Sequence, residues 1–84
     1  MNITAFSLQA IQTRYLSPGN VRGARIVAQA AAGRKVYSWQ HELNVEQNHI
    51  AAAEQFALSK NWTNDRAHGQ LADGSYVHVL IAKA

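Results

Sequence analysis

The chain has 84 residues, no cysteine and a formal net charge of +3, and 48% of its residues are hydrophobic. This length fits one domain with a modest core, and the lack of cysteine excludes disulfide bonds and thiolate metal sites. No apolar run approaches the ~20 residues that span a bilayer, and the N-terminus lacks the pattern of a signal peptide, so we expect a cytoplasmic protein without a membrane partner.

The charge is divided unequally between the two halves of the chain. Residues 1–41 contain five basic residues and no acidic residue, whereas residues 42–84 contain three basic and five acidic residues. If folding gathers the first set on one surface, that surface favours an acidic or polyanionic partner.

The first part of the chain predicts three strands. Over residues 5–16 the apolar alternation changes parity near Ala10 and Ile11, which indicates a bulge. A second strand is expected over residues 24–31, with Ile26 and the alanines of the same parity facing inward. Gly33 permits a tight turn into a third strand at residues 34–40, so the three strands form an antiparallel meander.

Residues 44–60 predict the helix of the fold. Asn44 is a favourable N-cap, and Gln47 lies three residues later, as in a capping box. The apolar stripe at helical spacing comprises Val45, His49, Ala52, Ala53 and Phe56.

The last part of the chain predicts a hairpin. Residues 67–72 and 75–82 flank Asp73-Gly74, a strong turn signal. In the final strand Val77, Val79 and Ile81 share one face, which we expect to be the core face, and His78 lies on the opposite face, which we expect at the surface. This strand is also a candidate seam for a homodimer.

Together these elements predict a single α+β domain over residues 1–84. It has a small antiparallel sheet of about five short strands, in the order β-β-β-α-β-β, with the helix packed on one face. The large side chains expected to form the core are Phe6, Leu8, Ile26, Val36, Phe56, Trp62, Val77, Val79 and Ile81.

The segment Tyr15-Leu16-Ser17-Pro18-Gly19-Asn20-Val21-Arg22-Gly23-Ala24-Arg25-Ile26 resembles short proteins of bacteriophages, prophages and plasmids. Later parts resemble the same group, from Tyr37 to Leu43, at Asn48-His49 and in the closing strand from Asp73 to Val77. The resemblance implies a mobile-element setting and carries no activity. Small proteins in that setting commonly bind DNA or host factors, or block host defence complexes.

Basic residues of the first half are the main candidates for a binding surface. Arg22 and Arg25 flank Gly23, and Arg34-Lys35 follow the next turn. The planar guanidinium group suits carboxylates and phosphates, so a cluster of these groups would bind a polyanion in a salt-dependent way. A solvated strand surface is the alternative interpretation.

Aromatic residues accompany these cations on the predicted third strand. Tyr37 and Trp39 alternate with Lys35 and His41, a pattern typical of surfaces that stack unpaired bases. The opposite face carries Val36 and two polar residues and is the poorer core set. The sequence therefore favours burial of the aromatic rings and leaves an exposed contact surface as the alternative.

The sequence offers no pattern for a metal site, a cofactor or catalysis. The histidines show no metal-ligand spacing, and His49, on the helical stripe, is expected to be a hydrogen-bonded core residue. No serine lies in a nucleophile elbow, and no two carboxylates are predicted to face each other across a cleft, so an enzyme is the least favoured class.

We therefore expect a non-catalytic binding protein of a phage or mobile element. Its partner would be a host protein or nucleoprotein complex, with inhibition of a host defence as one role. Direct binding of DNA or RNA through the same surface is the alternative, and a homodimer stays open. The candidate binding residues are Arg14, Arg22, Arg25, Arg34, Lys35, Tyr37 and Trp39.

Overall fold

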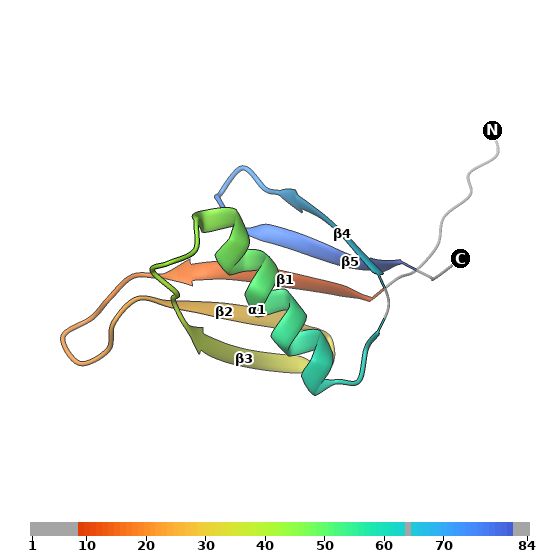
Figure 1. The fold of residues 1–84 in the computed structure, drawn as a ribbon, viewed down its shortest axis with the longest axis horizontal. Coiled ribbons are helices and arrows are strands. Elements are labelled where there is room, and N and C mark those ends of the chain that lie inside the picture. Colours follow the sequence, from red (N-terminus) through yellow and green to blue (C-terminus); the bar gives the residue numbers. More distant parts are fainter. Residues whose placement is uncertain (1–8, 64, 82–84) are drawn as a thin grey trace.

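The computed structural model describes residues 9–63 and 65–81. Five antiparallel strands form one open sheet in the order β3-β2-β1-β5-β4, and one helix packs on it, as the sequence predicts (Figure 1). The elements are β1 (Ala10–Leu16), β2 (Arg25–Ala30), β3 (Gly33–Ser38), α1 (Val45–Ser59), β4 (Asp65–Gln70) and β5 (Tyr76–Ile81).

The first strand lies at the centre of the sheet. β1 pairs with β2 on one side and with β5 on the other, so the predicted meander and the predicted hairpin are joined along β1. Both sides of β5 are hydrogen-bonded, to β1 and to β4, and the free edges belong to β3 and β4. β5 is therefore not an edge strand, so the candidate seam for a homodimer cannot form by edge pairing of β5.

The helix begins with the predicted capping box. The Gln47 backbone N–H donates to Asn44 Oδ1 at 2.8 Å, and the Asn44 backbone N–H donates to Gln47 Oε1 at 3.0 Å. The helix runs for 15 residues, and the described part of the chain contains no helix that is long and apolar enough to cross a membrane.

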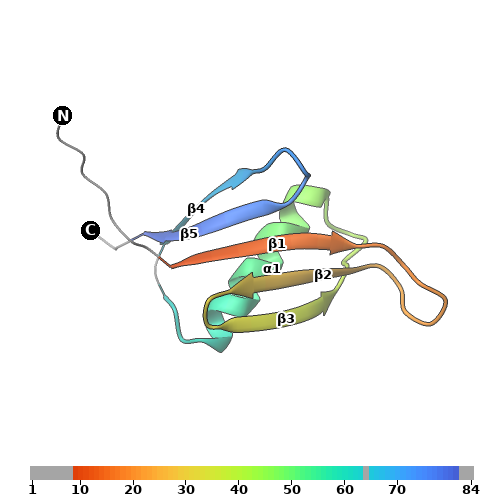
Figure 2. The same ribbon diagram turned by 180° about the vertical axis from the view of Figure 1, so that it is seen from behind.

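The core lies between α1 and one face of the sheet. The helix lies diagonally across that face, and the opposite face, seen in Figure 2, has no helix over it. Phe56 and the small residues Ala53 and Ala57 of the helix pack against Ile11, Ala28 and Leu80 of the sheet. Trp62, one of the expected core residues, follows the helix and contacts Phe56 edge-on at 5.9 Å between ring centroids, so it packs against the core as a partly buried residue.

The faces of β5 are the reverse of the sequence prediction. Register places Tyr76 beside Thr13 and His78 beside Ile11, so Tyr76, His78 and Leu80 face the helix and are buried. Val77 and Val79 lie on the opposite face and are only half-buried. A valine-rich face was expected to be the core face, but hydrogen bonding of His78 within the core makes burial of the polar face possible.

Other predicted core residues also lie outside the core. Val36 and Ile81 are 41% and 38% exposed, because both lie on the face of the sheet that the helix does not cover. Ile26 and Phe56 are buried as predicted. The predicted start of the first strand, residues 5–8 with Phe6 and Leu8, lies outside the described residues. The bulge expected near Ala10 and Ile11 is wrong, because the register of β1 with β5 continues without a break from Ala10 to Thr13.

Candidate functional site

Three of the predicted arginines share the uncovered face of the sheet. Arg14 lies opposite Val27 in the β1–β2 register, Arg25 lies two residues from Val27 along β2, and Arg34 lies opposite Gln29 on β3. Directly opposed residues have Cβ atoms about 5 Å apart and diagonal ones about 7–8 Å, so the three arginines surround Val27. We call Arg14, Arg25 and Arg34 the arginine cluster.

The residue at the centre of the arginine cluster is itself buried. Val27 is only 1% exposed although it lies on the uncovered face, between Arg14 and Val36 in register. The aliphatic stems of long neighbouring side chains cover apolar surface in this way. Val36, Val77, Val79 and Ile81 continue the apolar surface around the cluster and along β5.

The other predicted binding residues lie elsewhere. Arg22 is exposed in the connection between β1 and β2, and Lys35 faces the helix side of the sheet because it follows Arg34 by one residue. Tyr37 packs against the core, where burial raises its pKa. Trp39 meets Tyr15 edge-on at 5.0 Å between ring centroids. The rings of Tyr37 and Trp39 therefore lie apart from the arginine cluster. This agrees with the interpretation that the sequence favours, in which the two rings are buried.

Two acidic side chains lie near the arginine cluster or on the same face of the sheet. Asp73, in the turn between β4 and β5, accepts hydrogen bonds from the Ser75 hydroxyl and backbone N–H at 2.6 and 2.9 Å. These bonds lower the pKa of Asp73, and the charge of Arg14 contributes in the same direction. Asp65 lies on the same face as the cluster but on the far edge strand β4.

A second candidate is a polar group within the core. The Oγ1 atom of Thr13 lies 2.7 Å from His49 Nδ1 and 2.9 Å from His78 Nε2, and all three residues are buried. The structure confirms the core role expected for His49 and contradicts the surface position expected for His78. Tyr76 covers the group, with its ring 4.3 Å from that of His49.

Burial keeps both histidines uncharged at neutral pH. It lowers the pKa of His78 to about 4, and electrostatic interactions with His68, His49 and Arg66 add smaller contributions in the same direction. It also lowers the pKa of His49, and a hydrogen bond to the Thr13 backbone opposes this shift. Both groups are therefore neutral imidazoles with one donor and one acceptor nitrogen each.

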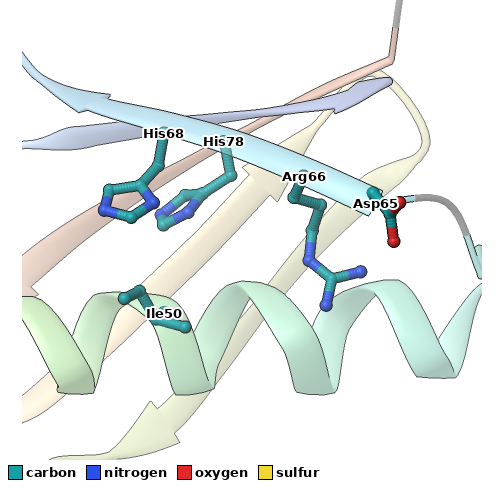
Figure 3. Close-up of a pocket in the computed structure, with 5 residues that line it drawn as sticks. All are labelled: Ile50, Asp65, Arg66, His68 and His78. Carbon is teal, nitrogen blue, oxygen red and sulfur yellow. The ribbon is translucent and has the colours of Figure 1, made fainter. Parts of the chain in front are cut away.

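A cleft of about 420 Å³ opens beside His78, between β4 and the helix. It is lined by Ile50 of the helix, by His78 of β5 and by Asp65, Arg66 and His68 of β4. Figure 3 shows the Arg66, His68 and His78 side chains extending from the sheet toward the helix, with Asp65 at the end of the strand. His68 Nε2 lies 3.5 Å from a carboxylate oxygen of Glu46 on α1.

Another cleft, also of about 420 Å³, is lined by His49. Tyr15, Trp39, Val45, Gln70 and Gly74 complete its lining, which is more apolar than that of the first cleft. The two buried histidines thus face two different clefts, with Thr13 between them.

The sequence contained one signal for this polar group. Thr13 shares the inward parity of Ile11, so a hydroxyl within a buried set required a partner. The partner could not be identified from the sequence, because His78 is 65 residues away and meets Thr13 only through the β1–β5 pairing. Among the described residues, no group of three or more His, Asp or Glu side chains is placed to hold a metal ion.

No protein-family model, no curated protein and no solved structure matches this chain significantly. A functional proposal therefore depends on the geometry of its own residues.

Proposed function

We propose that this chain is a non-catalytic binding protein that covers an acidic surface of another protein through the uncovered face of its sheet. The observation that carries the proposal is the placement of three arginines on adjacent strands of one face, next to the exposed Val36. The partner is a host protein or a nucleoprotein complex, in the mobile-element setting that the sequence resemblance implies.

The composition of this face supports a protein partner. The apolar centre of protein interfaces is commonly accompanied by arginine, and lysine is depleted there. Here Val36 and the half-buried Val77 and Val79 provide apolar area, and Arg14 and Arg34 are exposed beside it. Complementary carboxylates on a partner would steer the encounter and fix the orientation of the complex.

Direct binding of DNA or RNA is less well supported by the same face. A sheet that stacks unpaired bases presents aromatic rings on its surface. Tyr37 instead packs against the core, and Trp39 is half-buried against Tyr15 on the helix side. The arginines alone would contact phosphates, but the valines beside them have no counterpart on a nucleic acid backbone.

Occlusion is the mechanism that this surface allows. A domain of 84 residues with a rigid sheet can cover a functional site of a larger complex without any chemistry of its own. In the mobile-element setting, such a complex would belong to a host defence system.

The first test uses the immobilised protein to capture partners from bacterial lysate. Arg25→Glu/Arg34→Glu reverses two charges of the cluster, and Lys35→Glu/Lys60→Glu makes the same change in net charge away from it. We expect the arginine variant to lose a protein that the lysine variant retains, and we expect capture to weaken with added salt because the contact is electrostatic.

Two results would contradict the proposal. Retention of the captured protein by the arginine variant would show that the cluster is not the contact. A salt-sensitive mobility shift of DNA or RNA that is lost in the arginine variant, without any captured protein, would favour the nucleic-acid alternative. Circular dichroism of each variant checks that the domain remains folded.

A further inference from the structure

The second of the two clefts lies at the end of the sheet where the helix begins. The ends of β1 and β4 and the first turn of α1 all lie at that end of the molecule (Figure 1). The volume of about 420 Å³ falls within the range of small-molecule sites, which is about 300–1,000 Å³. We call it the aromatic cleft, and it is lined by Tyr15, Trp39, Val45, His49, Gln70 and Gly74.

Aromatic rings form much of the wall of this cleft. The ring of Trp39 meets that of Tyr15 edge-on at 5.0 Å and that of His49 edge-on at 6.3 Å between centroids. Aromatic pairs are favourable at centroid distances of about 4.5–7 Å, so a further ring in the cleft finds partners at suitable spacing. Tyr15 and Val45 are 49% and 55% exposed, and a bound ring would cover part of this apolar surface.

The aromatic cleft offers no partner to a charged ligand. Among the described residues, no lysine, arginine, aspartate or glutamate lines it. The Glu46 carboxylate, next to Val45 in the chain, is paired with His68 of the other cleft. A charged ligand would lose its hydration without gaining an opposite charge, so the cleft favours a neutral molecule.

His49 presents one ring nitrogen to the aromatic cleft. The residue is only 1% exposed, and its Nδ1 is engaged by the Thr13 hydroxyl at 2.7 Å. Its Nε2 has no hydrogen-bond partner among the described residues, yet no buried side-chain nitrogen or oxygen in them is unsatisfied, so Nε2 reaches the surface of the cleft that His49 lines. A single polar atom within an apolar cleft is the kind of group that orients a ligand.

We propose that the aromatic cleft binds a small neutral aromatic molecule of the phenol class, with its ring against Tyr15 and Trp39 and its hydroxyl group donating to His49 Nε2. A phenolic hydroxyl is a good donor, and the bare nitrogen of a neutral imidazole is a good acceptor. This site lies on the helix side of the sheet, away from the arginine cluster, and does not depend on the function proposed above.

Binding in this way fixes the direction of the hydrogen bonds within the core. A hydroxyl that donates to Nε2 requires His49 to carry its proton on Nδ1, which then donates to the Thr13 oxygen. The single Thr13 proton is then donated to His78 Nε2, and the proton of His78 lies on its Nδ1. The bound state therefore has one defined tautomer for each buried histidine.

The test is a titration of the isotope-labelled protein with phenol at neutral pH, followed by NMR of the indole and imidazole nitrogens. We expect saturable shifts at Trp39 and His49 at millimolar phenol or below, with the His49 proton on Nδ1 in the complex. The indole of Trp62, which follows the other end of the helix, is the internal control.

Two related molecules test the chemistry of the ligand. Benzene has the same ring without the hydroxyl group and should bind about tenfold more weakly than phenol, because it leaves His49 Nε2 without a partner. Benzoate carries a negative charge and should also bind at least tenfold more weakly, because nothing in the cleft neutralises it.

Two substitutions at exposed positions test the place of binding. Tyr15→Ser removes one wall of the cleft and should weaken phenol binding about tenfold. Leu58→Ser, at an exposed position near the end of α1, should leave it unchanged. Should Tyr15→Ser lose the dispersed spectrum of a folded protein, Val45→Ser takes its place, with a weakening of several-fold expected.

Several results would overturn the proposal. The first is the absence of a saturable shift at Trp39 and His49 with phenol, and the second is a His49 proton on Nε2 in the complex. Binding of benzene or benzoate as tight as that of phenol would show that the ligand class is wrong. Equal effects of the cleft variant and Leu58→Ser would show that phenol binds elsewhere.

Discussion

At the scale of single residues, the Thr13 hydroxyl is the central group of the core. It contacts two buried imidazoles, and its own side chain is fully buried. A hydroxyl can donate one hydrogen bond and accept two, so one threonine satisfies both histidines. The sequence could not reveal this arrangement, since a threonine in a strand is usually explained by strand propensity alone.

Removal of this hydroxyl should destabilise the domain. Thr13→Val keeps the size and shape of the side chain but leaves His49 and His78 without their partner, at a cost of about 1–3 kcal/mol for each unsatisfied group. Urea unfolding measures the loss. Thr13→Ser retains the hydroxyl and should lose less, and Thr63→Val, at an exposed position, should change little. Equal stability of the Val and Ser variants at position 13 would show that the hydrogen bonds contribute nothing.

At the scale of elements, local signals were reliable and face assignments were not. The capping box at Asn44 and the turn at Asp73-Gly74 could be predicted because their chemistry lies within a few residues. The inward face of β5 depends on its register with β1, which no local pattern specifies. Valine alternation suggested the wrong face, because the uncovered side of the sheet also carries valines.

The arginine cluster shows the same contrast between what local sequence signals predict and what depends on strand register. Arg34 and Lys35 are one residue apart on β3 and lie on opposite faces of the sheet, although the sequence made both of them candidates for one binding surface. The cluster itself depends on the register among β1, β2 and β3, which brings Arg14 next to the β2 arginine. The candidate binding residues predicted from the sequence therefore included all three arginines of the cluster. They also included Lys35 and the aromatic residues, which the sequence alone could not separate from the cluster.

The connection between β3 and α1 depends on a single asparagine. Asn48 is buried, and its side-chain amide donates to the carbonyl oxygens of Gln40, Leu43 and Asn44 at 2.9–3.3 Å. Its Oδ1 accepts the Gln40 N–H at 2.8 Å. One side chain thus holds the incoming loop against the first turn of the helix.

Asn48→Ala should therefore cost more than loss of the cap itself. Asn44→Ala removes an exposed cap and should cost about 1 kcal/mol. Asn48→Ala leaves buried backbone groups of the loop unsatisfied, and we expect about 2–3 kcal/mol. Thermal unfolding of the two variants side by side measures the difference. A smaller effect for Asn48→Ala would mean that water replaces its hydrogen bonds without cost.

At the scale of the whole molecule, the buried histidines link folding to pH. The pKa of His78 is about 4 in the folded protein and 6.5 in the reference state, so the unfolded chain binds the proton more readily between these values. His49 is shifted in the same direction. The contribution of these neutral histidines to the free energy of unfolding is therefore fully present above pH 6.5 and is lost as the pH falls toward 4.

The expected loss from His78 alone is about 3 kcal/mol over this range. Urea unfolding at a series of pH values between 7 and 4 measures it. His41→Gln, at an exposed position, serves as the control and should retain the whole pH dependence. A free energy of unfolding that stays constant over this interval would contradict the burial of a neutral His78.

The central position of β1 has a consequence for how the chain reaches this structure. β1 can pair early with β2, its neighbour along the chain, but its other side is completed only by a strand whose His78 follows Thr13 by 65 residues. Closing such a long loop is slow compared with forming a hairpin. During synthesis, a ribosome-bound chain exposing only the meander and the helix would carry an unfinished core, and cooperative folding would await the arrival of β5.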